Sequence, residues 1–300
     1  MTNKLRPLLA TEVKNLIDLK LPMLASVKLD GIYALIVDGV IYSRSFKPIK
    51  NKHVQKLFGN HDLNGLVGEL VCGDVYAEDV FRQTTTATMA EDGVNDVKLY
   101  VFDDWSVGDK PYQERYQHYQ RRIKALNHGS IVALEHNMLH TIDEVITALD
   151  KEQKRNGEGI ILRLPSAKWK NGRSTPKSQE SVKLKFFEQQ EYKIVDVVER
   201  MHNANEAKVN EMGYTERSSH KDNMIPMNTF GAFVMELQDG RNFNVGSGLG
   251  LTDAVRKEIW NNRDKYIGKI ATVRQMKVGS KNGIPRLPTF VGLRDKDDMS

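Results

Sequence analysis

The stretch SVKLDGIYALIVDGVIYSRSF, residues 26–46, sets a lysine inside a pattern that is otherwise typical of apolar strands. A strand alternates its faces, so we expect Lys28 and Asp30 to share one side of a sheet. Gly31 follows and permits a backbone conformation that a side chain would forbid. The stretch therefore predicts an ammonium group held on a sheet beside a carboxylate.

The second half of the same stretch predicts a hairpin. Asp38-Gly39 is a favourable pair for a two-residue turn, and it separates apolar runs at 32–37 and 40–43. Arg44 comes directly after the returning strand. A second cationic group is thus expected at a strand end near the lysine.

Lys28 allows two interpretations. An exposed Lys28–Asp30 pair on a solvated sheet would contribute little to stability. Alternatively, Lys28 is a nucleophile, which requires that burial or a cationic neighbour lowers the pKa of its ammonium group. The choice depends on the other polar groups that the chain brings to this place.

Composition narrows the class of protein. A length of 300 residues favours two domains, and 40% hydrophobic residues are enough for real cores. The single cysteine, Cys72, excludes an internal disulfide framework and a cysteine-rich zinc site, and it fits a reducing compartment. No run approaches the length of a membrane span, and the net charge of +5 mildly favours an anionic partner. We expect a complete intracellular protein.

Periodicity predicts a change of architecture near residues 187–191. Before it we expect helices at 10–20, 50–58, 111–126 and 142–155, and strands at 66–71, 98–102, 159–164 and 181–187. After it we expect strands at 192–199, 231–237, 241–245, 267–276 and 289–293, with a helix at 252–262. The fold class is therefore an α/β (α+β) domain of antiparallel sheets and helices at 1–188, followed by an all-β domain of the OB-fold type at 189–300.

A polar segment interrupts the second domain at 201–229. It has no clear period and carries several cations. A structureless insertion of this length is usually functional or disordered, and composition alone favours disorder.

Five further residues stand in strand contexts that suit chemistry on a nucleotide. They are Glu69 in VGELV, Phe102 in YVFDDW, Glu158 in NGEGIILR, and Lys183 and Lys185 in SVKLKFF. Each has a purely structural explanation: a salt-bridge partner, a core aromatic, or an amphipathic edge strand. Taken together they supply carboxylates for sugar hydroxyls and hydrated Mg²⁺, a stacking surface for a purine, and cations for phosphates. With Lys28 as nucleophile, the set suits transfer of a nucleotidyl group.

Six motifs in order give the chain a family resemblance. They are KLDG at 28–31, SRSFKP at 43–48, GEL at 68–70, YVFDDW at 100–105, EGIIL at 158–162 and VKLKF at 182–186. In this order they resemble the motifs of covalent nucleotidyltransferases, a superfamily of DNA ligases, RNA ligases and messenger-RNA capping enzymes. The chain is most similar to ATP-dependent DNA ligases, particularly the minimal virus-encoded type known from Chlorella virus.

The resemblance continues through most of the chain. It includes NGRST at 171–175, GYTERSSHK at 213–221, FNVGSG at 243–248, YIGK at 266–269 and GIPRLPTFVGLRD at 283–295. The NAD-dependent ligases are a poorer match, because they are much longer and carry extra zinc and helical domains. The resemblance thus implies a nucleotidyltransferase domain followed by an OB-fold domain.

The resemblance implies roles around the nucleotide. Lys28 would be adenylylated by ATP, and Phe102 would stack on adenine, with Ser26 on the adenine side. Glu69 and Glu158 would lie near the ribose and a catalytic Mg²⁺ or Mn²⁺. Lys183 and Lys185 would hold the α-phosphate and help activate the DNA-adenylate step.

It also implies roles toward DNA and pyrophosphate. Arg44 would bind the 5′-phosphate at a nick in duplex DNA, and Arg173 would help to hold that phosphate. Arg286 and Arg294 resemble the last motif of the barrel, which orients pyrophosphate during lysine adenylylation. The insertion at 201–229 would be the latch of the minimal ligases, closing around the duplex. The chain length and the full set of motifs suggest a monomer. We expect it in the cytoplasm of a bacterial or virus-infected host cell, acting in DNA replication, repair or recombination.

One position departs from the family pattern. Many members carry arginine two residues after the glycine of the lysine motif, where this chain has Tyr33. A phenol can donate one hydrogen bond but supplies neither the charge nor the planar fork of a guanidinium group. We expect weaker affinity for the nucleotide or the nick, or compensation by another cation.

Three alternatives remain at this point. An RNA ligase or an RNA-capping guanylyltransferase would also use Lys28, although the matches at 213–221 and 283–295 favour a DNA ligase. From a different class, the chain would be a noncatalytic OB-fold protein that binds nucleic acid, with Lys28 structural.

Overall fold

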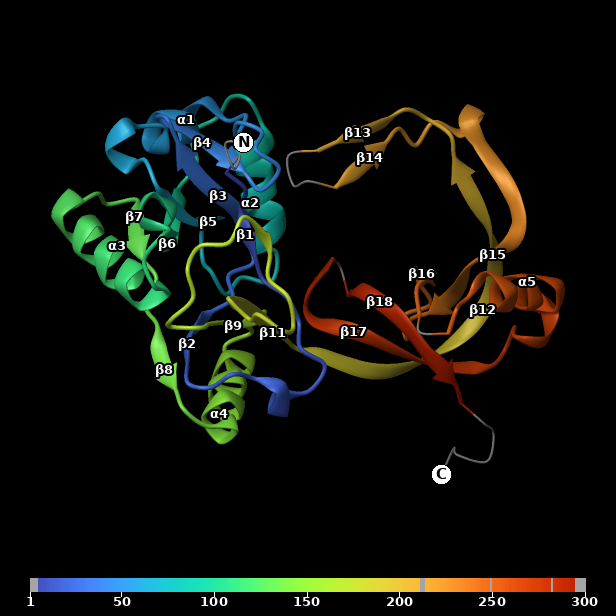
Figure 1. Cartoon of the computed structure of the whole chain (residues 1–300). Helices are drawn as coiled ribbons and strands as arrows, with labels where there is room; N and C mark the ends of the chain where they lie inside the picture. The colour runs from blue at the N-terminus through green and yellow to red at the C-terminus, as the bar shows by residue number, and fades with distance from the viewer. Residues whose placement is uncertain (1–4, 211–213, 249, 282, 295–300) are drawn as a thin grey trace. The chain divides into compact units, whose positions relative to one another are not determined.

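Figure 1 shows the computed structural model, which describes residues 5–210, 214–248, 250–281 and 283–294. The chain forms two compact units. The first comprises Met1–Lys185 and Val209–Tyr214, and the second comprises Phe186–Lys208 and Thr215–Ser300.

Two larger sheets form the frame of the first unit. One has the strand order β4-β3-β5-β6-β7 and the other has the order β11-β9-β2-β8. Their strands are β2 (Met23–Val27), β3 (Ile32–Val37), β4 (Val40–Ser43), β5 (Leu66–Cys72), β6 (Val97–Asp104), β7 (Ile131–Ala133), β8 (Asn137–Leu139), β9 (Gly159–Arg163) and β11 (Ser181–Lys185). Neighbouring strands are antiparallel, except for the parallel pair β6 and β7. A short parallel pair, β1 (Leu8–Leu9) and β10 (Gly172–Arg173), lies outside both sheets.

Within the described residues, four α-helices complete the first unit. They are α1 (Lys52–Phe58), α2 (Val80–Met89), α3 (Tyr112–Leu126) and α4 (Ile142–Lys154). The core of the five-stranded sheet includes buried side chains such as Ile36, Phe58 and Tyr119, which come from a strand and two helices. A separate core lies between the four-stranded sheet and α4, where Val145 is fully buried. Thr141 caps α4 by accepting a hydrogen bond from the backbone of Glu144, whereas Asp143, the other candidate near the helix start, lies within the first turn.

Three of the predicted helices are confirmed, and one is wrong. The segment 10–20 contains only a 3-10 turn at Leu16–Asp18. Its backbone is used elsewhere, because Thr11 donates to the carbonyl of Ser181 at 3.0 Å and accepts from the amide of Lys183 at 2.8 Å. A partner 170 positions away therefore decides the conformation of this segment, whereas helix α2 forms without having been predicted.

The motif at 28–31 joins the two sheets instead of lying within one strand. Strand β2 ends at Val27 in the four-stranded sheet, and β3 begins at Ile32 in the five-stranded sheet. Gly31 is required for space, because a Cβ atom there would lie 2.2 Å from the carbonyl oxygen of Leu70. This replaces the expectation that Gly31 is needed for its backbone angles.

The predicted hairpin is confirmed. Strands β3 and β4 pair with Val37 opposite Val40, and the two turn residues, Asp38 and Gly39, have φ angles of 49° and 75°. Two positive φ angles match the primed turn that fits the twist of paired strands.

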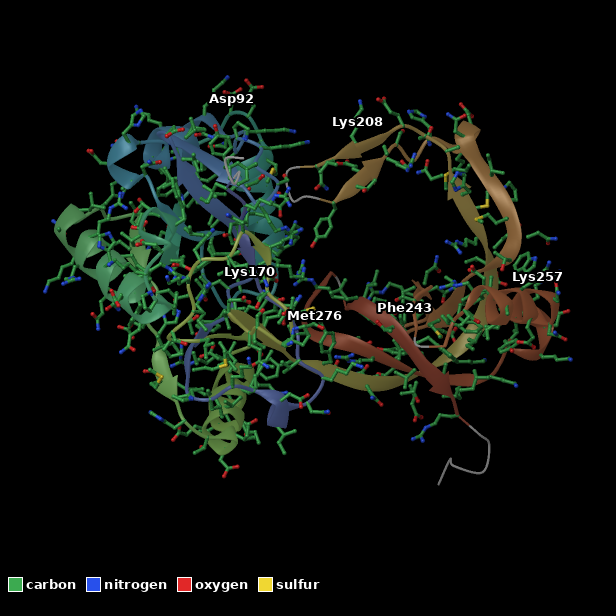
Figure 2. All side chains as sticks on the ribbon, in the orientation of Figure 1. Asp92, Lys170, Lys208, Phe243, Lys257 and Met276 are labelled. Carbon is green, nitrogen blue, oxygen red and sulfur yellow. The ribbon has the colours of Figure 1, made fainter. Side chains whose placement is uncertain are left out.

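The second unit is built on one sheet with the order β16-β15-β12-β17-β18. Its elements are β12 (Phe187–Asn203), β15 (Met224–Glu236), β16 (Asn242–Val245), α5 (Asp253–Asn261), β17 (Ile270–Lys281) and β18 (Ile284–Leu293). The buried residues of its core include Ile194, Phe233 and Phe243, and the last of these is labelled in Figure 2. All five predicted strands and the helix are present. The expected closed barrel is not: within the described residues, no ladder joins β16 to β18, and only an isolated bridge, Gly248 with Phe290, links the segment after β16 to β18.

The segment 201–229 is more regular than its composition suggests. Strands β12 and β15 extend into it from either side, and β13 (Ala207–Val209) pairs with β14 (Thr215–Arg217). Asn205 lies at the base of this hairpin and is 7% exposed. Its amide donates to the carbonyls of Ser218 at 2.9 Å and His220 at 3.0 Å, and it accepts from Asn223 at 2.9 Å. One buried amide thus ties the two ends of the insertion together.

Within the parts of the chain that the structure describes, no helix has both the length and the apolar character needed to cross a bilayer.

Candidate active site

Glu158 joins two lysines in the first unit. It precedes β9, and Lys28 follows β2, the neighbouring antiparallel strand, where its amide donates to the carbonyl of Gly159 at 2.9 Å. The Lys28 Nζ forms an ion pair with Glu158 Oε2, and Lys185 Nζ lies 2.6 Å from Oε1. The Glu158 side chain is 3% exposed. Three residues that are far apart in sequence thus form one buried charged cluster.

The charges of this cluster determine its protonation. Burial alone would raise the pKa of Glu158, but the ammonium groups of Lys28 and Lys185 outweigh it and hold that pKa below its ordinary value. Burial alone would lower the pKa of Lys28, but the carboxylates of Glu158 and Glu69 outweigh it and raise that pKa. Without nucleotide, Lys28 is therefore a protonated ammonium group. The lowered pKa expected for a nucleophile is not a property of this state.

Glu69 is a carboxyl group of a different kind. It lies half-buried on β5, opposite Tyr33 on β3. Burial raises its pKa to about 8, because the attraction of Lys28 only partly offsets the loss of solvent. Near neutral pH, Glu69 is therefore mostly uncharged unless a cation approaches it.

The two lysines of β11 share one face, as their alternation predicts, while Val182 and Leu184 are buried on the other. Their partners differ. Lys185 binds Glu158, whereas Lys183 Nζ lies 3.1 Å from Glu12 Oε1, and the Glu12 side chain is 61% exposed. Lys183 is therefore the lysine more easily released to an incoming anion.

Phe102 lies at the centre of an aromatic and cationic cluster. Its ring centroid is 5.7 Å from that of Tyr33, with an interplanar angle of 57°. The Arg163 guanidinium lies over the Phe102 ring, with 4.6 Å between Cζ and the ring centroid. Phe102 is partly exposed, so it is not sealed within the core as the neighbouring Val101 is.

Tyr33 and Arg163 share an unusual property. Within the described residues, the Tyr33 hydroxyl and Arg163 Nε are the buried side-chain polar atoms without a hydrogen-bond partner. Both residues lie against Phe102.

Sequence analysis did not single out Arg163. The available signal was its position in GIILR, where alternation places Arg163 on the same face as Ile161, opposite the apolar face of Ile160 and Leu162.

Other predicted residues of the first unit lie in defined places. Ser26 is 6% exposed on β2, opposite Ile161. The Arg44 guanidinium lies 4.7 Å from the ring centroid of Tyr214. Arg173 donates from Nη1 to the carbonyl of Ala10 at 2.7 Å.

Two predicted residues belong to the second unit. Arg294 forms an ion pair with Glu191, and Arg286 lies on β18 opposite Met276.

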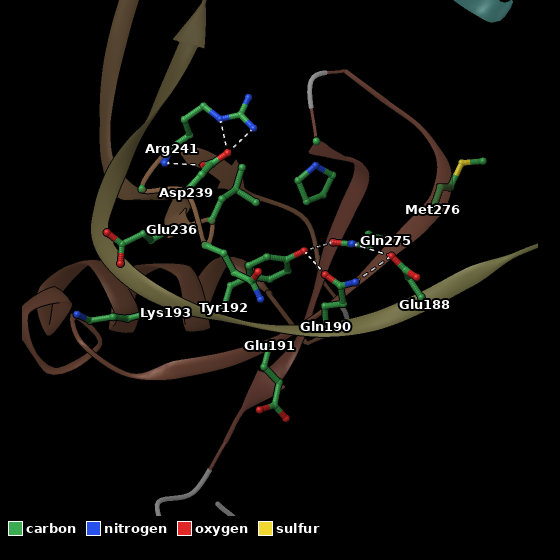
Figure 3. Close-up of a pocket in the computed structure, with 15 residues that line it drawn as sticks. Glu188, Gln190, Glu191, Tyr192, Lys193, Glu236, Asp239, Arg241, Gln275 and Met276 are labelled. Carbon is green, nitrogen blue, oxygen red and sulfur yellow. Dashed lines mark hydrogen bonds and ion pairs between the residues drawn. The ribbon is translucent and has the colours of Figure 1, made fainter. Parts of the chain in front are cut away.

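A pocket of about 890 Å³ also lies in the second unit (Figure 3). The Tyr192 hydroxyl lies 2.7 Å from Gln190 Oε1 and 2.9 Å from Gln275 Oε1, and Gln275 donates to Glu188 at 3.0 Å. The polar groups of this wall are thus satisfied by one another. The pocket contains none of the lysines or glutamates predicted to act on a nucleotide, so we do not take it as the active site.

The carboxylates of the site set limits on how a metal ion could be held. Among the residues that the structure describes, no group of three or more His, Cys, Asp and Glu side chains forms a metal cage. Glu69 nevertheless suits a hard divalent cation, since its oxygens are of the kind that Mg²⁺ prefers and a nearby cation would favour its charged form. Both oxygens of Glu158 already face ammonium groups. The residues therefore fit an ion held mainly through phosphate oxygens and water, as is usual for Mg²⁺ with nucleotides.

Fold and site together define a nucleotidyltransferase domain followed by an OB-like domain. A family profile described as "ATP dependent DNA ligase domain" matches residues 7–185, and one described as "DNA ligase OB-like domain" matches residues 226–294. The chain belongs to the ATP-dependent DNA ligases, and it is an enzyme of that class.

Solved structures agree with this assignment. The chain is 26% identical to the DNA ligase-adenylate of Chlorella virus, with a TM-score of 0.56, covering 96% of this chain and 99% of that one. A Lig E DNA ligase, described as binding DNA with a minimal scaffold, is 20% identical with a TM-score of 0.68 over 96% of this chain and 99% of that one, and supports the fold. A comparison with curated proteins finds no match.

Proposed function

We propose that the chain seals nicks in duplex DNA through a lysyl-AMP intermediate on Lys28 and a DNA-adenylate. The observation that carries this proposal is the cluster of Lys28, Glu158 and Lys185, which lies in the same unit as the partly exposed Phe102. It combines an amine, a base and a phosphate-binding cation with a stacking surface in one unit.

In the first step, the Lys28 amine attacks the α-phosphorus of ATP. A nitrogen–phosphorus bond forms, the bond between the α-phosphorus and its bridging oxygen breaks, and pyrophosphate leaves with the electron pair. The Lys28 ammonium must first lose a proton, and Glu158 accepts its hydrogen bond, so this carboxylate is well placed to take it. Lys183 and Lys185 neutralise phosphate charge, and Phe102 stacks on adenine.

In the later steps, AMP passes to the 5′-phosphate of the nick, and the 3′-hydroxyl then displaces AMP. Arg44 and Arg173 are proposed to hold the 5′-phosphate, and Arg294 to orient pyrophosphate during the first step. Bound Mg²⁺ or Mn²⁺, lying near Glu69 and Glu158 and held mainly through phosphate oxygens and water, would stabilise charge on phosphate oxygens.

The two parts of the chain are proposed to divide the work. Residues 1–188 form the adenylyltransferase domain, and residues 189–300 form the OB-fold domain with a latch at 201–229 that closes around DNA. Contacts with phosphates would fix the position of the protein on the duplex without recognising the base sequence. Because these contacts are electrostatic, the affinity for DNA should fall as the salt concentration rises. We propose a monomer that acts in the cytoplasm of a bacterial or virus-infected cell.

Incubation with radiolabelled ATP and Mg²⁺ tests the first step. The proposal expects an acid-labile label on the protein that is absent from Lys28→Ala and is chased into sealed product by a nicked duplex. Label that persists in Lys28→Ala would contradict it. Duplexes with all-DNA, RNA-splinted and all-RNA strands separate a DNA ligase from an RNA ligase, and labelling by GTP instead of ATP would indicate a capping enzyme.

A further inference from the structure

Arg163 is a buried charge that the proposed steps do not use. It is 5% exposed at the end of β9, and its Nη1 lies 3.6 Å from Asp103 Oδ2, beyond ordinary hydrogen-bond distance. Its Nε donates to no acceptor within the described residues. Burying a guanidinium group with so few hydrogen bonds is costly, so a reason for its presence is needed.

The nearby carboxylate does not supply that reason. Asp103 already accepts two hydrogen bonds from Arg115, from Nε at 2.8 Å and from Nη2 at 3.1 Å. Arg115 is also satisfied by the carbonyls of Lys110 at 2.7 Å and Ala167 at 2.9 Å. Two buried guanidinium groups therefore share one carboxylate, and Arg163 is the less well bound of the two.

Aromatic rings are the main surroundings of Arg163. Its Cζ lies 4.6 Å from the ring centroid of Phe102 and 5.1 Å from that of Tyr112. A cation over the face of an aromatic ring is attracted by the ring quadrupole, most strongly where water is excluded. The Tyr112 hydroxyl also donates to the backbone carbonyl of Phe102 at 2.8 Å, which fixes the strand that carries the ring. Tyr33 supports the same ring from β3.

We propose that Arg163 is a positioning residue that holds the Phe102 ring, from the face it covers, in the orientation in which the exposed part of the ring stacks on a purine. This inference rests on the proposed role of Phe102 toward the adenine of ATP. Arg163 does not touch the nucleotide and acts only through the ring. Its positive charge draws electron density toward the covered face, which favours stacking of an electron-rich base on the remaining surface.

The test measures the rate of Lys28 adenylylation against ATP concentration for the full-length protein. Arg163→Met removes the charge but keeps much of the length, and we expect it to raise the ATP concentration for half-maximal rate by about tenfold with a nearly unchanged limiting rate. Arg163→Lys retains a cation and should recover part of this loss. Arg155→Met is a matched control, because the exposed Arg155 lies over Tyr76 at 5.9 Å in the same unit. It should behave as the unmodified protein.

A double-mutant cycle shows whether Arg163 acts through the ring. Phe102→Ala alone should weaken ATP binding, and adding Arg163→Met to it should cause no further loss. The proposal would be overturned if the two substitutions raised the ATP concentration for half-maximal rate independently, so that the double mutant showed the product of the two single effects. It would also be overturned if Arg163→Met left this concentration unchanged. If Arg163→Met does not fold, which its melting curve shows, the same cycle with Arg163→Lys decides.

The outcomes separate this inference from the function on which it rests. An effect of Phe102→Ala without an effect of Arg163→Met defeats only the role of Arg163. No effect of Phe102→Ala defeats the stacking role of Phe102, and absence of any label on Lys28 defeats the proposed function itself.

Discussion

The Lys28 ammonium group and the Glu158 carboxylate form a buried ion pair at the point where β2 and β9 run side by side. Glu158 raises the pKa of the amine that it would later deprotonate, so the resting site holds its nucleophile in the inactive, charged form. The rate of Lys28 adenylylation should therefore rise with pH through the neutral and mildly alkaline range.

Glu158→Gln tests this relationship directly. Glu158 is the main carboxylate that raises the pKa of Lys28 against the effect of burial, and it also neutralises the nearby charge of Lys185. Without this carboxylate, both burial and the positive charge of Lys185 disfavour the ammonium form, so the pKa of Lys28 should fall. The pH at which Lys28 becomes half-reactive toward a small amine reagent should move to lower values. Breaking this buried cluster should also cost about 3 kcal/mol of unfolding free energy near neutral pH. Glu12→Gln, which removes only the exposed partner of Lys183, should leave the Lys28 titration unchanged.

Glu69→Gln should change how stability depends on pH. The pKa of Glu69 is raised to about 8 in the folded chain, so the folded state holds this proton more tightly than the unfolded state does. Stability from Glu69 is fully present below the ordinary glutamate pKa of 4.5 and is lost as pH rises toward 8. Glutamine has no such proton. As pH rises from 4.5 to about 8, the unfolding free energy of the variant should increase relative to that of the unmodified protein by at most about 5 kcal/mol. The increase should be smaller than this limit, because the Glu69 side chain is partly solvated.

Urea unfolding at pH 5, 7 and 9 measures this difference. Glu114→Gln, at an exposed position on α3, is the control and should follow the unmodified protein at every pH. A Glu69→Gln difference that is constant with pH would show that Glu69 is ionised in the folded chain throughout.

Tyr33→Phe should not destabilise the protein. The Tyr33 hydroxyl is buried without a partner, so its removal loses no hydrogen bond and relieves the desolvation of a polar group, with an expected gain of about 1 kcal/mol. Tyr112→Phe is the matched comparison, because its hydroxyl donates to Phe102 and lies 2.9 Å from His136 Nε2. That variant should lose about 1 to 2 kcal/mol. Equal losses in both melting curves would show that Tyr33 has a partner in solution.

The parts of the fold that the sequence predicts are those with local causes. The Asp38-Gly39 turn and the start of α4 depend on a few neighbouring residues: the turn is confirmed, and of the two candidates near the helix start, Thr141 and Asp143, the cap is Thr141. The segment 10–20 was wrongly predicted because Thr11 pairs with residues 181 and 183, and no local pattern reveals a partner so distant. The role of Gly31 was misjudged for the same reason, since the limiting atom belongs to Leu70.

The site shows the same division. Motif order indicated which residues matter, and the structure brings Lys28, Glu158 and Lys185 together. The protonation of Lys28 could not be predicted, because its sign depends on whether burial or the surrounding carboxylates have the larger effect. Arg163 was missed because a charge at the end of a short strand is usually exposed, and only the three-dimensional position of Phe102 gives it meaning.

Asn205→Ala tests whether the insertion at 201–229 is organised before DNA binds, on the proposal that it serves as a latch. The Asn205 amide bonds two carbonyls and accepts a third hydrogen bond, so alanine leaves buried groups unpaired at the hairpin base. Hydrogen exchange of β13 and β14 should become faster, and the nicked-DNA concentration for half-maximal sealing should rise about tenfold, because ordering the segment would then oppose binding. Lys28 adenylylation without DNA should be unchanged. Asn242→Ala, at an exposed position on β16, should alter neither measurement. Faster hydrogen exchange with an unchanged DNA concentration for half-maximal sealing would mean that an ordered hairpin is not needed for DNA binding. A slower adenylylation of Lys28 would mean that the substitution also affects the chain outside the insertion.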